Sequence, residues 1–251
     1  MVKSSPKDKL RLDLLMVKKG LAYSREKAKA MIMAGEVEIN GIRADKPGNT
    51  VPVSSNITIK DAYPPYVSRG GLKLEAALDH FLIDVTGLTL LDIGASTGGF
   101  TDCLLKRGAE KVIAVDVGYG QFHYKLRNDH RVTLLEKTNA RYLTPDDIKE
   151  KIQGAVIDVS FISIKLIIPP ISKLLLDDSF IIALIKPQFE AGRPQVGKGG
   201  VVRDTLVHKQ VLETIILFSE DQGWNVIGNI LSPILGPKGN REFLLYMKRG
   251  A

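Results

Sequence analysis

The chain has 251 residues, of which 44% are hydrophobic, so it can fold as one large domain or as one domain with a smaller partner domain. The formal net charge is +7, and residues 1–60 hold 12 Lys/Arg against 6 Asp/Glu. A basic N-terminal segment, followed by a nearly neutral remainder of the chain, favours an N-terminal arm that binds a polyanion. A solvated basic face without any partner would have the same composition.

Several classes of protein are excluded or disfavoured. The single cysteine, Cys103, excludes an internal disulfide and is compatible with a reducing compartment. No long uncharged apolar stretch opens the sequence, so we expect no signal peptide and a cytoplasmic protein. No apolar run approaches the length of a membrane span. The four histidines lack the spacing of a metal site, so we expect no bound metal.

The first 60 residues predict two helices and a small sheet. A mainly helical pattern of leucines covers residues 8–20, and Ser24 can cap a second helix that ends at Gly35. The pair Asn40-Gly41 between short apolar runs predicts a hairpin. Two further short strands are expected at 51–53 and 57–59. We therefore predict a small basic module at 1–62 and, because of adjacent prolines, a stiff linker at 63–69; the family resemblance described below implies that this module binds RNA.

Helix and strand alternate through residues 70–251, which predicts a mainly parallel sheet with helices on both faces. The expected strands are Leu90–Gly94, Val112–Val117, Val132–Glu136, Ala155–Val159, Phe180–Lys186, Val226–Ser232 and Glu242–Lys248. The expected helices are 71–81, 97–107, 162–176 and 205–224. No helix separates the last two strands, so they should pair antiparallel at a sheet edge. The predicted fold class is α/β: a Rossmann-like, seven-stranded methyltransferase sheet with a small N-terminal α+β domain.

The segment Leu90–Thr101 (LLDIGASTGGFT) is the most informative motif. A buried strand ends in an acid and runs into a glycine turn, where the backbone can approach a ligand closely. The next strand ends in Asp116, an acid suited to the hydroxyls of a nucleoside ribose. The turn lacks the GxGxxG spacing of dinucleotide sites and the Lys-Ser/Thr pair of phosphate loops. S-adenosylmethionine is therefore the best candidate cofactor.

The residues expected around this cofactor are Asp92, Gly94, Ser96, Gly98, Gly99, Phe100, Asp116, Val117, Asn139 and Ala140. Two of these assignments stay open in the sequence. Asp92 could contact the amine of the cofactor or cap the loop. Phe100 could form the wall of the site or belong to the core.

Four charged residues, Lys73, Asp158, Lys186 and Glu242, lie before the first expected strand or at strand ends. Charges at the ends of buried strands are costly unless they are paired or used. A structural ion pair would explain Asp158 and Lys186 taken alone. Together with the glycine turn, the four indicate a catalytic site.

The sequence also resembles a known family. RLDLLMVKKGLAYSREKAKAMIMAGEVEINGIRADKPG is similar to the RNA-binding module named after ribosomal small-subunit protein four. YVSRGGLKLEAAL, LDIGASTGGFTDCLL, VIAVDVGYGQ, DVSFIS, IKPQFEAG and GNREFLLYM resemble the TlyA (hemolysin A) subgroup of the FtsJ-like 2′-O-methyltransferases. The resemblance implies methylation of a ribose 2′-hydroxyl in ribosomal RNA, with cytidine as the expected nucleoside.

In that family a Lys-Asp-Lys-Glu tetrad carries the reaction, and by motif it corresponds to Lys73, Asp158, Lys186 and Glu242. A 2′-hydroxyl must lose its proton as it attacks a methyl group, and Lys186 is the candidate that deprotonates or steers it. A lysine needs a depressed pKa to act as a base, which Lys73 would favour and Asp158 would oppose. Positioning can therefore matter more than proton abstraction. Glu242 is expected to hold a lysine or the ribose.

Basic residues of the N-terminal segment are the candidates for contact with ribosomal RNA or ribosomal subunits. They are Arg11, Lys18, Lys19, Arg25, Lys27, Lys29, Arg43 and Lys46. The glycine-rich basic loop Glu190–Asp204 is expected to be a mobile substrate loop, with an ordinary surface connection as the alternative. Two other functions remain open: a membrane-damaging hemolysin, and an RNA-binding factor without catalytic activity.

Overall fold

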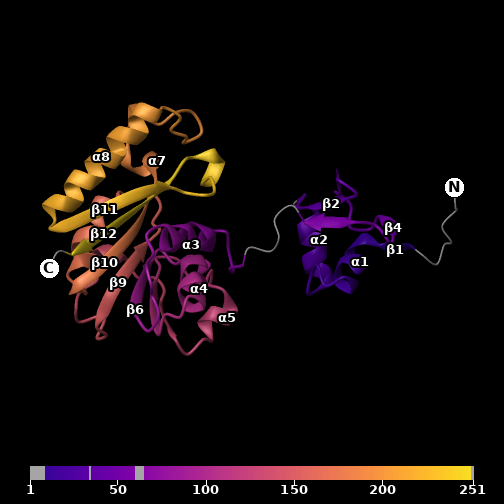
Figure 1. Ribbon diagram of the computed structural model, residues 1–251, viewed down its shortest axis with the longest axis horizontal. Helices are drawn as coiled ribbons and strands as arrows, with labels where there is room; N and C mark the ends of the chain where they lie inside the picture. The colour runs from indigo at the N-terminus through magenta and orange to yellow at the C-terminus, as the bar shows by residue number, and fades with distance from the viewer. Residues whose placement is uncertain (1–8, 34, 60–64, 250–251) are drawn as a thin grey trace. The chain divides into compact units, whose positions relative to one another are not determined.

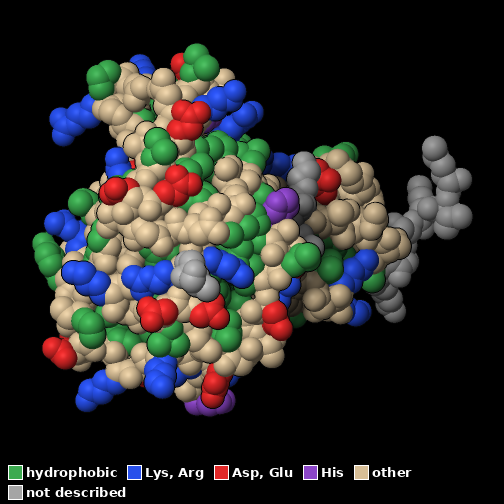
Figure 2. Space-filling model, turned by 60° about the vertical axis from the view of Figure 1, so that its left-hand side comes forward, with side chains coloured by type: hydrophobic (Ala, Val, Ile, Leu, Met, Phe, Trp, Pro, Cys, Tyr) green, Lys and Arg blue, Asp and Glu red, His purple; other side chains and the backbone are tan. Residues whose placement is uncertain are grey.

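The computed structural model describes residues 9–33, 35–59 and 65–249. The chain divides into two compact units, Met1–Tyr63 and Pro64–Ala251, which we call the N-terminal unit and the C-terminal unit (Figure 1). Each unit has its own cluster or clusters of buried hydrophobic side chains. On the face shown in Figure 2, basic and acidic side chains are intermixed among hydrophobic and uncharged surface.

The N-terminal unit contains two helices, α1 (Leu12–Lys18) and α2 (Arg25–Met33), around a small apolar core. Its strands are β1 (Lys9–Arg11), β2 (Val37–Ile39), β3 (Ile42–Arg43), β4 (Thr50–Pro52) and β5 (Ile57–Ile59). The amide of Lys27 donates to Ser24 Oγ at 3.2 Å, which confirms the predicted cap of α2. Asn40 and Gly41 have φ of 50° and 82° and join β2 to β3, so the predicted hairpin is also confirmed.

The start of this unit differs from the prediction. Instead of a helix from residue 8, β1 comes first and pairs antiparallel with β4, with Leu10 opposite Val51. The partner strand lies some forty residues away in the sequence, so local periodicity could not reveal it. The remaining strands form a separate sheet in the order β3-β2-β5.

Within residues 65–249 the C-terminal unit has a seven-stranded sheet in the order β11-β12-β10-β9-β6-β7-β8. The strands are β6 (Thr89–Ile93), β7 (Lys111–Val115), β8 (Val132–Leu135), β9 (Ile152–Ile157), β10 (Leu175–Ile185), β11 (Trp224–Leu231) and β12 (Phe243–Arg249). Parallel pairing joins β8, β7, β6, β9 and β10, whereas β12 runs antiparallel to both β10 and β11. The predicted α/β sheet with a reversed last strand is confirmed.

The main helices are α3 (Gly70–His80), α4 (Gly99–Lys106), α6 (Ile168–Ser172) and α8 (Thr205–Asp221). Shorter elements are α5 (Tyr124–Arg127), α7 (Pro187–Glu190), η2 (Ala140–Tyr142), η3 (Ile164–Leu166), η4 (Arg193–Gln195) and η5 (Pro237–Gly239). The single helix expected over 162–176 is wrong. Pro169 and Pro170 lack the N–H that would continue a helix from η3, so a separate α6 starts at them and β10 follows.

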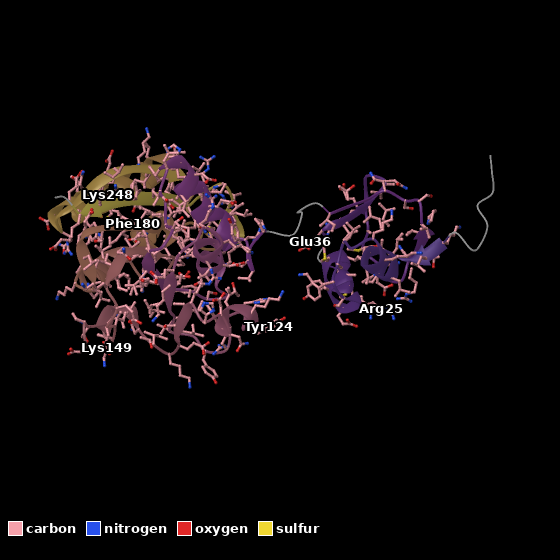
Figure 3. All side chains as sticks on the ribbon, turned by 60° about the horizontal axis from the view of Figure 1, so that its bottom comes forward. Arg25, Glu36, Tyr124, Lys149, Phe180 and Lys248 are labelled. Carbon is pink, nitrogen blue, oxygen red and sulfur yellow. The ribbon has the colours of Figure 1, made fainter. Side chains whose placement is uncertain are left out.

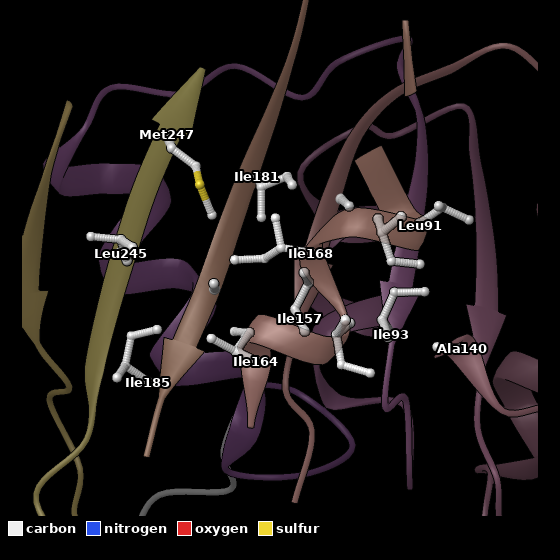
Figure 4. Close-up of a cluster of buried hydrophobic side chains, with 14 of the residues drawn as sticks. Leu91, Ile93, Ala140, Ile157, Ile164, Ile168, Ile181, Ile185, Leu245 and Met247 are labelled. Carbon is white, nitrogen blue, oxygen red and sulfur yellow. The ribbon is translucent and has the colours of Figure 1, made fainter. Parts of the chain in front are cut away.

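Successive side chains of the central strand β6 pack on opposite faces of the sheet. Leu91 and Ile93 belong to the cluster that contains Ile157 and Ile168, which Figure 4 shows between the sheet and the helices on that side. Leu90 belongs to the second cluster, with residues of α3 and α4. This alternation places the neighbouring Asp92 on the side of α4.

The expected linker 63–69 is only partly separate from the C-terminal unit. Tyr66 is buried, and its hydroxyl donates to Glu75 Oε1 of α3 at 2.7 Å. The amide of Val67 donates to Asp102 Oδ2 of α4 at 2.8 Å. Residues 66–69 therefore pack on the C-terminal unit, while positions 63 and 64 of the expected linker lie outside the described residues.

Candidate active site

The sheet topology brings the four predicted catalytic residues to one edge. Asp158 follows β9 and Lys186 follows β10, and these neighbouring strands are parallel, so both side chains lie at the same edge. Glu242 precedes β12, whose first residue pairs with the last residue of β10 because the two strands are antiparallel. Lys73 reaches this edge from the first turns of α3.

The four side chains form two ion pairs. Lys186 Nζ lies 2.5 Å from Asp158 Oδ1 and donates to Ser160 Oγ at 2.9 Å. Lys73 Nζ donates to Glu242 Oε2 at 2.6 Å, and the Glu242 side chain is fully buried. Each lysine therefore has its own carboxylate partner, which stabilises the charged ammonium.

Two glycines make room for these pairs. Gly94 has a φ of +83°, and a Cβ there would lie 2.4 Å from the carbonyl oxygen of Asp158. A Cβ on Gly236 would lie 2.0 Å from Glu242 Oε1. Sequence reasoning predicted Gly94 but missed Gly236, because the residue pattern does not show that the loop folds back to place the Glu242 carboxylate on this glycine.

Two adjoining hollows lie at this sheet edge. The first, of about 530 Å³, is lined by both lysines, Asp158, Asp92 and the loop segment 234–237. The second, of about 480 Å³, lies over the ends of β6, β7 and β9. Both hollows are lined by Gly94, Ser96 and Asp158. The ion pair Lys186–Asp158 thus lies where the two hollows meet.

Asp116 lines the second hollow with its carboxylate held in place. The amide of Ser96 donates to Asp116 Oδ2 at 2.7 Å, and that of Gly118 donates to Oδ1 at 2.6 Å. Ser96 has a φ of +49°, so the chain turns sharply at this point of the loop. A carboxylate oxygen can accept more than one hydrogen bond, so Asp116 can still receive ribose hydroxyls.

Asp92 is fully buried at the floor of the first hollow. Thr101 Oγ1 donates to its Oδ2 at 2.6 Å, and its Oδ1 has no hydrogen-bond partner among the described residues. Burial raises the pKa of Asp92 to about 7, and the charges of Asp158 and Asp116 contribute in the same direction. The hydrogen bond of Asp92 therefore comes from α4, whereas the capping alternative required a bond from the loop.

These features fit S-adenosylmethionine. An acid suited to ribose hydroxyls in one hollow, a glycine turn at the junction and an unpartnered carboxylate oxygen beneath the other suit a nucleoside that carries a cationic amino-acid chain. Of the remaining predicted cofactor residues, Ser96, Gly99 and Phe100 line the first hollow, and Val117, Asn139 and Ala140 line the second. Phe100 is also part of the core, so both of its open alternatives apply.

Gly98 differs from the other predicted cofactor residues, because it lines neither hollow. Its φ is +92°, and a Cβ there would lie 2.5 Å from Leu126 Cδ1. The glycine is needed where the chain turns into α4 and packs against Leu126 of α5, and its contact with the cofactor stays a prediction.

The basic residues predicted to contact RNA have different environments. Arg11 and Arg25 both donate to the buried carboxylate of Asp13, and together they lower its pKa to about 2. Lys19 Nζ donates to the carbonyl of Ser55 at 2.8 Å, and the guanidinium of Arg43 lies against Gly35. Figure 3 labels Arg25 on the N-terminal unit. The other candidates are Lys18, Lys27, Lys29 and Lys46, which are exposed or half-buried.

Sequence reasoning missed Phe161, which lines the second hollow. Its side chain is 90% exposed, its φ is +63°, and its ring lies 5.0 Å from that of Phe189. An open hollow beside it is also lined by Arg141 and Arg193. An exposed ring next to cations is suited to stacking on a nucleobase. Sequence reasoning gave no signal for it, because its exposure depends on the conformation of the loop after β9.

Among residues 9–33, 35–59 and 65–249, no cluster of His, Cys, Asp or Glu could hold a metal ion. Over the same residues, no helix is both long and apolar enough to cross a membrane.

Comparison with known proteins relates both units to characterised families. Residues 66–249 match the model of the FtsJ-like methyltransferases, and residues 10–57 match that of the S4 domain. The 16S/23S rRNA (cytidine-2′-O)-methyltransferase TlyA of Mycobacterium tuberculosis is 45% identical over 239 residues, which cover 95% of this chain and 89% of that protein.

Two further relatives were found. YqxC of Bacillus subtilis, named provisionally as an rRNA methyltransferase, is 52% identical over 240 residues, which cover 95% of this chain and 85% of that protein. A solved structure from Streptococcus thermophilus, named provisionally as a hemolysin, is 48% identical with a TM-score of 0.77. The match covers 96% of this chain and 89% of the S. thermophilus chain.

Proposed function

Because the chain belongs to the FtsJ-like methyltransferase family and carries an S4 domain, we propose that it methylates a ribose 2′-hydroxyl of ribosomal RNA, with cytidine as the nucleoside. The name of the M. tuberculosis relative supports this substrate and this position of methylation. The observation that carries the proposal is the Lys186–Asp158 pair at the junction of the two hollows.

S-adenosylmethionine, when bound, supplies an electrophilic methyl group on a sulfonium. Asp116 would hold its ribose, Gly94 and Ser96 would line its amino-acid chain, and the unpartnered oxygen of Asp92 would accept from its amine. Each of these assignments is a proposal based on position in the hollows and on donor or acceptor chemistry.

Lys186 orients the nucleophile. Held by Asp158 and Ser160, its ammonium donates hydrogen bonds and has no lone pair with which to accept a proton. It therefore positions the 2′-oxygen for in-line attack and stabilises the negative charge that develops there. In the transfer, a bond from the methyl carbon to the 2′-oxygen would replace the carbon–sulfur bond of the cofactor, and the hydroxyl proton would pass to solvent. Lys73, fixed by Glu242, contributes a second positive charge to the same hollow.

We propose the following division of labour along the chain. Residues 1–62 bind RNA, residues 63–69 connect the units, and residues 70–251 carry the methyl transfer. The basic side chains of the first segment would contact phosphates of a folded ribosomal RNA, so affinity would fall with salt. Such a substrate implies that the protein acts where ribosomes are made, in the cytoplasm.

The test is methyl transfer from tritiated S-adenosylmethionine to unmodified ribosomal subunits. We expect label in RNA with the wild type, and a loss of at least about 100-fold with Lys186→Ala, because transition-state positioning is removed. Lys149→Ala is the matched control, since Lys149 is exposed in the loop before β9, at the opposite edge of the sheet, and is labelled in Figure 3.

Three other results would contradict the proposal. Full transfer by Lys186→Ala would remove its assigned role. Cofactor binding without transfer to any ribosomal RNA would favour an RNA-binding factor without catalytic activity. Leakage of liposomes by the pure protein, without cofactor binding, would favour the hemolysin alternative.

A further inference from the structure

Two loops of the C-terminal unit are tied together by one buried side chain. The first loop, residues 196–203, connects η4 to α8, and the second, residues 232–242, connects β11 to β12. Asn240 of the second loop is 3% exposed. Its Nδ2 donates to the carbonyl of Gly200 at 2.9 Å, and its Oδ1 accepts from the amide of Val202 at 3.1 Å. Figure 1 shows the loop before α8 beside the loop before β12.

Each loop is also ordered from within. The amide of Gly197 donates to the carbonyl of Val201 at 3.0 Å, which closes a tight turn, and His208 Nε2 lies 3.0 Å from the carbonyl of Val202. In the second loop, Gly236 and Asn240 close a turn with a 2.9 Å bond. Lys238 lies at its tip with a φ of +58°, a strained conformation for lysine that the surrounding bonds maintain.

These loops carry four exposed cations, Lys198, Arg203, Lys238 and Arg241. None of the four has a hydrogen bond or an ion pair with another described side chain. The acids nearby are engaged: Asp204 caps α8 through the amide of Leu206, and Glu242 is buried against Lys73. The four cations of the two loops therefore have no carboxylate partner among the described residues.

The second loop borders the catalytic hollow. Residues 234–237 line the first hollow, and Glu242 at the end of the loop holds Lys73. A polynucleotide whose ribose enters this hollow must continue past its rim, and its phosphates carry one negative charge each. The four cations lie on the loops that form and support this part of the rim.

We propose that Lys198, Arg203, Lys238 and Arg241 form a ridge that binds the phosphates of the RNA strand next to the target nucleotide, and that Asn240 sets the shape of this ridge. The proposal rests on the proposed function, because it takes RNA as the substrate. It adds an RNA-binding surface to the catalytic unit, separate from the basic residues predicted in the N-terminal unit. The glycine-rich loop, expected from sequence to be mobile, would instead be a braced part of the substrate site.

The test uses the full chain and purified unmodified ribosomal subunits, with affinity measured against KCl concentration in the absence of cofactor. The ridge variants are Lys198→Gln with Arg203→Gln, and Lys238→Gln with Arg241→Gln. Each lost phosphate contact should lower the slope of log affinity against log salt by about 1. We expect each pair to weaken binding at low salt by about tenfold, with S-adenosylmethionine affinity unchanged in calorimetry.

The matched control is Lys149→Gln with Lys151→Gln. These two exposed lysines precede β9, about 20 Å from Asp158 by the length of a six-residue strand. The control should retain the salt slope of the wild type. Asn240→Ala removes no charge, so a weaker affinity in this variant, with an unchanged melting temperature, would support the bracing role of Asn240.

Ridge variants that bind subunits with the affinity and salt slope of the wild type would overturn the inference, even if methyl transfer were demonstrated. An equal loss in the Lys149/Lys151 control would also overturn it, because the effect would then be one of total charge. Ridge-dependent binding in a protein that transfers no methyl group would leave the ridge in place and reject the proposed function.

Discussion

Two buried aspartates of this chain have opposite shifts in pKa, and their partners explain the difference. Asp13 meets two guanidinium groups, and its pKa falls to about 2. Asp92 meets one hydroxyl, from Thr101, and burial raises its pKa to about 7. Burial favours the neutral acid, and only nearby positive charge or several donors can outweigh it.

The raised pKa of Asp92 predicts a pH-dependent loss of stability. Between about pH 4 and pH 7 the folded state retains a proton that the unfolded state has lost, so stability falls as the pH rises through this window. Asp92→Asn removes the titration but keeps an oxygen for Thr101. The free energy of unfolding of this variant, relative to that of the wild type, should therefore be higher at pH 8 than at pH 5 by at least about 1 kcal/mol. This corresponds to roughly 2 to 4 °C in melting temperature.

Thermal melts at the two pH values, without cofactor, measure this difference. Asp146→Asn is the control, because Asp146 is exposed in a surface loop. If the melting temperatures of the wild type and Asp92→Asn changed in parallel with pH, the buried acid would not titrate in this range.

At the scale of elements, Glu190 links the loops that follow β9 and β10. Its Oε2 accepts from Ser163 Oγ at 2.6 Å, and its Oε1 accepts from the amide of Ile164 at 2.7 Å. The Asp158–Lys186 pair joins the same two loops five or so residues earlier. Glu190 therefore braces the loops that carry the catalytic ion pair.

Removing this brace should impair turnover more than cofactor binding. We expect Glu190→Ala to lower kcat about tenfold or more, because small displacements of positioned groups are costly in the transition state. Ser163→Ala removes one of the two bonds and should have a smaller effect, and the double variant should equal Glu190→Ala. Steady-state kinetics with calorimetry of cofactor binding checks this. Unchanged kcat in Glu190→Ala would exclude the bracing role.

The elements also show what sequence reasoning can reach. Asp116, Asp158 and Lys186 follow apolar runs that could only be buried strands, and parallel topology then brings their side chains to one edge. β1 was missed because its pairing is non-local, and Pro169-Pro170 divided a predicted helix. Gly236 and Phe161 gave no local signal, because the first depends on how its loop folds back onto Glu242 and the second on an exposed loop conformation.

At the scale of the whole molecule, positive charge and chemistry are divided between two units. The excess of Lys and Arg lies in residues 1–60, whereas the two ion pairs of the candidate site and both hollows lie within residues 65–249. The sequence predicted this division of charge. It did not show that Arg11 and Arg25 serve the fold of the N-terminal unit through Asp13, since the Asp13–Arg25 contact spans two helices.

The central claim is that the site transfers a methyl group to a ribose oxygen. The most direct measurement is to digest ribosomal RNA, treated with protein and S-adenosylmethionine, to nucleosides and to identify the methylated product by mass spectrometry. The account predicts 2′-O-methylcytidine with the wild type and its absence with Lys186→Ala. A methyl group on a base, or 2′-O-methylcytidine formed equally by Lys186→Ala, would contradict it.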